Sequence, residues 1–178
     1  MAQPVSRVQR VYGERIGPRR RLALAVTSAL HAVLTRISGR TLGGLPRVAG
    51  IPVLRGPGAG PASRAKLEAG LELLADAAPG RKNRLRANVL GIFLARQPSA
   101  HGHYSRITGT CTLDLERLAG ENSIETAAAL VRCATEAWLW RAGRGRATDD
   151  EYRILALSER AGRQFVRRVR ASTIRPLR

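Results

Sequence analysis

Residues 123–143 read Ser-Ile-Glu-Thr-Ala-Ala-Ala-Leu-Val-Arg-Cys-Ala-Thr-Glu-Ala-Trp-Leu-Trp-Arg-Ala-Gly. Ser123 is a residue type that caps helices and Glu125 falls in the first turn, so a helix is predicted to begin at residue 124. Small and apolar residues recur along one side of it at helical spacing: Ala127, Val131, Ala134, Thr135 and Trp138. The stretch therefore predicts a capped helix whose apolar side packs on a core.

The middle of this helix has the spacing of a zinc-binding motif. Residues 131–137 read Val-Arg-Cys-Ala-Thr-Glu-Ala. They resemble the Val-His-Glu-Ala-Thr-His-Ala stretch of a largely uncharacterised bacterial family of zincin-like, metallopeptidase-type proteins. In a His-Glu-x-x-His helix the two histidines lie on one face and bind one Zn²⁺. The glutamate is the general base for the metal-bound water.

The residues that this chemistry needs are replaced. Arg132 stands at the place of the first histidine, Cys133 at that of the base and Glu136 at that of the second histidine. A guanidinium stays protonated and repels a cation, so Arg132 cannot be a ligand. We expect a degenerate member without catalytic residues, bound metal, cofactor or enzyme activity. An Arg132–Glu136 ion pair at i, i+4 is the simpler role for these side chains.

The resemblance extends from residue 51 to the C-terminus through the order of its elements. The family has an Ile-Pro-Val-Leu segment, a Leu- and Ala-rich helix, a basic helix, a Thr-Cys-x-Leu strand, the His-Glu helix and an Arg-rich last helix. The corresponding segments around the His-Glu helix are residues 51–54, 67–74, 81–94, 110–113 and 151–169. The resemblance implies a third ligand, usually glutamate, on the last helix. The chain has Leu155 or Ser158 near that place, with Glu159 and Glu151 as imperfect substitutes.

Hydrophobic periodicity predicts the same elements from the residues themselves. It predicts a short strand at residues 47–54, then a helix capped by Ser63 and ended by Pro79-Gly80. A basic helix over residues 81–95 and an alternating strand at residues 106–114 follow. The predicted buried positions of the basic helix and that strand are Leu85, Val89, Ile92, Phe93, Ile107, Gly109, Cys111 and Leu113. The last helix opens with a capping box, Thr148 to Glu151, and carries an apolar stripe. That stripe is Ile154, Leu157, Ala161, Phe165 and Val169.

We therefore predict an α+β, mainly helical fold, with zincin-like helices packed on a small sheet over residues 47–178. Residues 1–46 are predicted to form a basic arm with a short apolar helix and a Gly/Pro linker. Arg19, Arg20 and Arg21 precede an uncharged segment, residues 22–34, that is shorter than the ~20 residues of a membrane span. Three interpretations stay open for it: a helix on an anionic membrane surface, a helix packed on the domain, or a secretion signal.

The net charge and the remaining candidate metal ligands limit which functions are possible. The net charge is +18, and Lys66 and Lys82 are the only lysines among 31 basic residues. Such a charge attracts anions at low salt. Aromatic residues are only 4% of the chain, so few side chains are available for stacking on the bases of single-stranded nucleic acid. His101 and His103 are a weak candidate pair for a metal, because no third ligand is evident. Glu136 is a further weak candidate, because one carboxylate next to a guanidinium makes no zinc site.

Cys111 and Cys133 are expected to be two buried thiols, unless the strand and the helix that carry them touch. An active hydrolase would need its nucleophile and base from Cys111, Cys133, His101 or His103, and nothing in the sequence brings a histidine to a cysteine. The first hypothesis is thus an inactive metallopeptidase-like domain with a binding or structural role, membrane-associated or cytoplasmic. The alternative is a protein that binds nucleic acid or another anionic surface through its Arg-rich helices.

Overall fold

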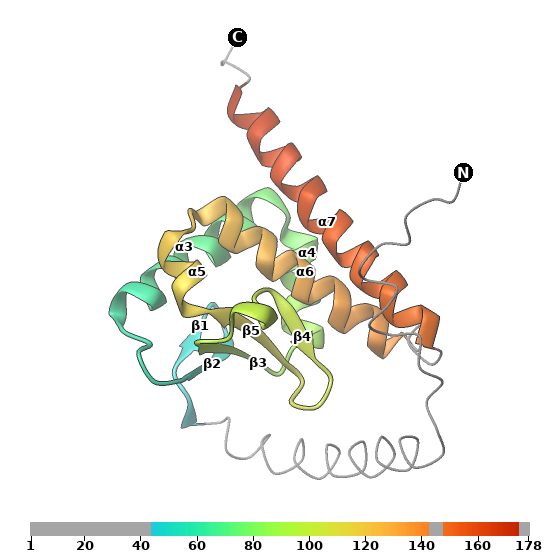
Figure 1. The fold of residues 1–178 in the computed structure, drawn as a ribbon. Coiled ribbons are helices and arrows are strands. Elements are labelled where there is room, and N and C mark those ends of the chain that lie inside the picture. Colours follow the sequence, from blue (N-terminus) through green and yellow to red (C-terminus); the bar gives the residue numbers. More distant parts are fainter. Residues whose placement is uncertain (1–43, 143–147, 175–178) are drawn as a thin grey trace, which may run out of the picture.

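The structure, a computed structural model, describes residues 44–142 and 148–174. These residues form an α+β, mainly helical fold in which helices pack on a small five-stranded sheet, as predicted (Figure 1). Arg19, Arg20, Arg21 and the apolar segment 22–34 lie outside the described residues. Among the described residues, no helix is both long enough and apolar enough to cross a membrane.

The sheet has the order β1-β2-β3-β5-β4. Its strands are β1 (Arg47–Val48), β2 (Ile51–Arg55), β3 (Gly91–Ala95), β4 (His103–Ser105) and β5 (Thr110–Asp114). The three inner strands are parallel, and β1 and β4 join the two edges in antiparallel pairs. Parallel neighbours need a crossover, which α3 (Pro61–Ala77) and α4 (Pro79–Asn88) supply between β2 and β3. The edge strand β4 is therefore a hairpin partner of β5, outside the parallel centre.

The prediction of one basic helix over residues 81–95 is wrong in its second half. α4 ends at Asn88, Val89 is extended, and residues 91–95 form the central strand β3. Ile92 and Leu94 are fully buried. A strand covered on both faces reads as a continuous apolar run, which periodicity cannot separate from a buried helix.

Two predicted strands are also corrected. Residues 47–54 form the β1–β2 hairpin, whose turn holds Ala49 at φ +47 and Gly50 at φ +82. The alternating strand begins only at Thr110, because residues 106–109 turn back from β4 to β5. Ile107 is consequently 56% exposed, whereas Cys111 and Leu113 are fully buried as predicted. All five residues of β5 are buried, so it is not the half-exposed strand that the alternation indicated.

The helices α3 and α6 (Ser123–Arg141) begin at caps that the sequence placed only approximately, whereas the short helix α5 (Leu115–Gly120), capped by Asp114, was not predicted. α3 starts at Pro61 after Gly60, two residues before the predicted cap Ser63. The cap of α6 is Asn122, not Ser123: its side chain accepts from the Glu125 amide at 3.0 Å, and Glu125 accepts from the Asn122 amide at 3.1 Å. Such reciprocal caps satisfy two backbone donors and fix where the helix begins.

α6 is the centre of the core. It packs on α3, on α4 and on α7 (Thr148–Ile174), and it lies over β4 and β5 (Figure 1). Its predicted apolar side is buried except at Trp138, which is 37% exposed. On α7 the predicted stripe is buried except at Leu157, also 37% exposed. The buried faces hold α7 against α6, and this contact brings the candidate site together.

Candidate functional site

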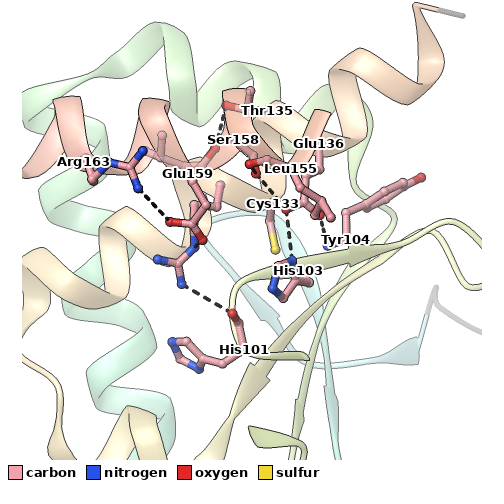
Figure 2. A network of polar contacts seen from close by, with 12 residues as sticks. His101, His103, Tyr104, Cys133, Thr135, Glu136, Leu155, Ser158, Glu159 and Arg163 are labelled. Atoms are coloured by element: carbon pink, nitrogen blue, oxygen red, sulfur yellow. Dashed lines mark hydrogen bonds and ion pairs between the residues drawn. The ribbon is translucent and has the colours of Figure 1, made fainter. Parts of the chain in front are cut away.

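Three elements bring polar side chains to one place at the middle of α6. Arg132 and Glu136 come from α6, His103 and Tyr104 from the edge strand β4, and Ser158 and Glu159 from α7 (Figure 2). Glu136 meets Ser158 while Arg132, one turn earlier, meets Glu159, so α6 and α7 run in opposite directions here. The two positions singled out by motif spacing, Arg132 and Glu136, thus both face the last helix.

Glu136 is the buried hub of this network, with 2% of its surface exposed. It accepts hydrogen bonds from His103 Nδ1 at 3.1 Å, from the Tyr104 backbone amide at 2.8 Å and from Ser158 Oγ at 3.0 Å. A buried carboxylate is tolerated where charged or polar donors satisfy it. The predicted Arg132–Glu136 pair does not form, because both carboxylate oxygens of Glu136 face β4 and α7 instead.

The same contact changes the protonation of His103. The hydrogen bond with Glu136 stabilises the protonated ring and raises the pKa of His103 above its ordinary value, although burial opposes this. Burial also raises the pKa of the neighbouring Tyr104 hydroxyl. His103 and Glu136 are therefore joined by a hydrogen bond that becomes an ion pair when the imidazole takes up a proton.

Arg132 fills the space between β4 and α7. Its Nε lies 3.6 Å from Glu159 Oε1, and its Nη2 donates to the carbonyl of His101 at 3.4 Å. A Cβ on Gly102, which has φ +72, would come within 2.5 Å of Nη2. A Cβ on Gly162 would come within 3.0 Å of the Arg132 side chain at Cγ. Two glycines thus make the room that the long arginine side chain needs.

Cys133 is bonded to Cys111, so the prediction of two buried thiols is wrong. Both cysteines are fully buried, and the bond ties α6 to the inner strand β5. Sequence reasoning left the pairing open because it could not place strand and helix side by side. A disulfide sulfur can act neither as a general base nor as a nucleophile.

His101 and His103 do not act as a pair. His101 is buried; its Nδ1 accepts from the Asp114 amide at 3.0 Å, and its Nε2 lies 3.0 Å from Glu121 Oε1. The His-x-His spacing therefore sends the two rings to different carboxylates. Over residues 44–142 and 148–174, no group of three or more His, Cys, Asp or Glu side chains could hold a metal ion.

A hollow of about 420 Å³ opens beside the network, between α6 and α7. Arg132 and Glu159 line it together with charged residues of both signs, chiefly Glu121, Glu125, Arg163, Arg167 and Arg170. Glu159 also pairs with Arg163 at 3.7 Å. This arrangement has the charges to bind a polar or ionic group.

Sequence reasoning missed the roles of Tyr104, Gly102 and Gly162. Tyr104 contributes its backbone amide, which no side-chain pattern can reveal. In the sequence, the roles of the glycines were signalled only by their neighbours. Gly102 lies between two histidines, and Gly162 lies next to the apolar stripe of the last helix. Comparison of the chain with known protein families, with curated proteins and with solved structures gives no match.

Proposed function

We propose that residues 47–178 are a catalytically inactive, metallopeptidase-like domain with a binding or structural role. One observation carries the proposal: Glu136, at the second ligand position of the resembling motif, meets Ser158, a residue considered for the third ligand position, at 3.0 Å. Two ligands of one zinc ion lie similarly near each other, on the two helices that the family uses. Arg132 and the disulfide at Cys133 account for the loss of catalysis.

Restoring the ligands tests this proposal. The variant with Arg132→His, Glu136→His and Ser158→Glu keeps the disulfide and offers two histidines and a glutamate, the set of a catalytic zinc site. We expect about one Zn²⁺ per chain in this variant and none in the wild-type protein, by metal analysis after dialysis. The wild-type protein is expected to cleave no peptide.

The matched control carries Arg132→His and Glu136→His with Ser158→Ala. It has the same two histidines without the carboxylate, so its zinc affinity is expected to fall at least about tenfold below that of the restored variant. Stoichiometric zinc in the wild-type protein would contradict the proposal. Equal zinc affinity in the restored and control variants would show that α6 and α7 do not present a third ligand.

A second candidate function is binding to an anionic surface, and the charge of +18 favours it. On this proposal Arg19, Arg20 and Arg21, with the apolar segment 22–34, bring the domain to an anionic membrane. Nucleic acid is the competing partner, with charge as its only support. The two functions are compatible, because an inactive domain can be the part that an arm holds at a surface.

A further inference from the structure

The hollow between α6 and α7 is lined by charged groups of both signs. Its volume of about 420 Å³ falls in the range of pockets that hold small molecules. Glu121, just before α6, and Glu125, in its first turn, line it on one side. Because α6 and α7 run in opposite directions, the start of α6 lies near the second half of α7, which contributes Arg167 and Arg170. An acidic wall and a basic wall therefore enclose this end of the hollow.

The charges of the two walls do not pair with each other. Among the ion pairs of the described residues, Glu121 belongs only to the pair with the buried His101. None of these ion pairs includes Glu125, Arg167 or Arg170. Arg167 and Arg170 are both exposed. Carboxylates and guanidinium groups thus line one hollow without closing it by ion pairs of their own.

Two charged groups at the hollow are largely buried and incompletely hydrogen-bonded. The side chains of Glu121 and Arg132 are each 20% exposed. Within the part of the chain that the structure describes, Glu121 Oε2 and Arg132 Nε have no hydrogen-bond partner. Buried polar atoms without partners destabilise a fold. A ligand that donates to the carboxylate and accepts from the guanidinium would therefore stabilise the folded protein.

We propose that this hollow binds a small dipolar ion with an ammonium and a carboxylate group, such as an amino acid. The ammonium lies at Glu121 and Glu125, and the carboxylate lies at Arg167 and Arg170, through charge-assisted hydrogen bonds. The glutamates repel a simple anion and the arginines repel a simple cation, so a ligand with both charges suits both walls. The inference goes beyond the proposed function, since none of these four residues belongs to the Glu136 network.

The test titrates the isotope-labelled full chain and follows its amide chemical shifts by NMR in a low-salt buffer. The probes are glycine, γ-aminobutyrate and ε-aminocaproate, which carry the same two charged groups at increasing separation. Acetate and methylammonium carry one of the groups each. We expect at least one dipolar probe to cause saturable shifts around the hollow. Acetate and methylammonium are expected to bind at least about tenfold more weakly, because each meets only one favourable wall.

Glu125→Gln tests the acidic wall without removing the cap of α6. Glu125 accepts from the Asn122 amide at 3.1 Å, and glutamine can replace glutamate in such a capping box. The variant therefore loses the charge and keeps the start of the helix. We expect it to weaken binding of the dipolar probe about tenfold.

Arg167→Gln combined with Arg170→Gln tests the basic wall and should weaken binding of the dipolar probe at least about tenfold. The matched control is Arg160→Gln combined with Arg168→Gln, which removes two exposed charges from the same helix outside the hollow. Its binding is expected to stay within about twofold of the wild-type value. No saturable binding of any dipolar probe, acetate binding as tight as theirs, or equal weakening by the control overturns the site. The zinc experiment changes none of these residues, so its failure is distinct from failure of this site.

Discussion

Replacing Glu136 with glutamine removes one charge from the buried network without changing its shape. The carboxylate accepts three hydrogen bonds through two oxygens, whereas the amide has one oxygen and a donor group. With its oxygen toward the Tyr104 amide, the glutamine amide nitrogen faces the Ser158 hydroxyl and His103 Nδ1, and His103 Nδ1 can accept from it only while the imidazole is neutral. We expect Glu136→Gln to lower the free energy of unfolding by about 2 kcal/mol, the cost of losing one charge-assisted hydrogen bond in a buried place.

The loss is expected to depend on pH through His103. Its pKa in the folded protein is raised, so its contribution to stability is complete below the unfolded pKa and is lost as pH rises through the folded pKa. Glutamine at position 136 removes the chief cause of that rise. The difference in unfolding free energy between wild-type protein and Glu136→Gln should therefore be larger near pH 5.5 (about one unit below the ordinary histidine pKa) than near pH 8.5.

Urea unfolding at the two pH values, without reductant, measures both effects. Thermal melting at the lower pH should show a midpoint roughly 6 °C lower for Glu136→Gln. Glu159→Gln is the matched control, since Glu159 is the adjacent carboxylate on α7 with 41% of its side chain exposed. Its ion pairs with Arg132 and Arg163 are partly solvated, so its replacement is expected to cost less than about 1 kcal/mol.

Two results would refute this reasoning. An equal loss in Glu136→Gln and Glu159→Gln would mean that the burial of Glu136 does not govern its contribution. A loss in Glu136→Gln that is the same at both pH values would mean that Glu136 does not set the protonation of His103.

Two further predictions concern the disulfide and the arm. Replacing both Cys111 and Cys133 with alanine should lower the unfolding free energy by about 3 kcal/mol, because the disulfide closes a loop of 22 residues. Urea unfolding with and without reductant checks this. If reductant did not change the stability of the wild-type protein, the prediction would be contradicted. Replacing Arg19, Arg20 and Arg21 with glutamine should lower the affinity for phosphatidylglycerol vesicles about 100-fold, because each arginine contributes roughly 1 kcal/mol to binding. Co-sedimentation with the vesicles measures this affinity. Unchanged sedimentation would show that the arm is not the anchor.

The sequence predicted the fold class and most of the buried helix positions because helical periodicity is a local property. Leu67, Leu71 and Leu74 recur at helical spacing and are fully buried, and α6 begins within one residue of its expected start. The strand β3 was missed because its apolar run is compatible with a buried helix. Ile107 was predicted to be buried because the alternation of apolar and polar residues continues through a turn. The turn is evident only from the pairing of β4 with β5, and Ile107 is exposed on it.

The candidate site was predictable in its residues but not in its contacts. Arg132, Cys133 and Glu136 were named from the spacing of the motif, Ser158 from the family resemblance and His103 from the His-x-His pair. Their partners depend on how β4 and α7 approach α6, over separations of 33 residues for His103–Glu136 and 22 for Ser158–Glu136. A local rule favoured the i, i+4 pair of Arg132 with Glu136, and tertiary contacts with better geometry replaced it.

On the proposed relationship, the contacts of Arg132 and Glu136 distinguish a site repacked after the loss of its zinc from one that has only lost the ion. Loss of a zinc ion alone would leave an inward-facing polar residue without donors, at a cost of about 1–3 kcal/mol for each buried group. Glu136 instead has three donors, and a Cβ at Gly102 or Gly162 would crowd the Arg132 side chain. On the proposed relationship, this network now joins α6, β4 and α7 as part of the core.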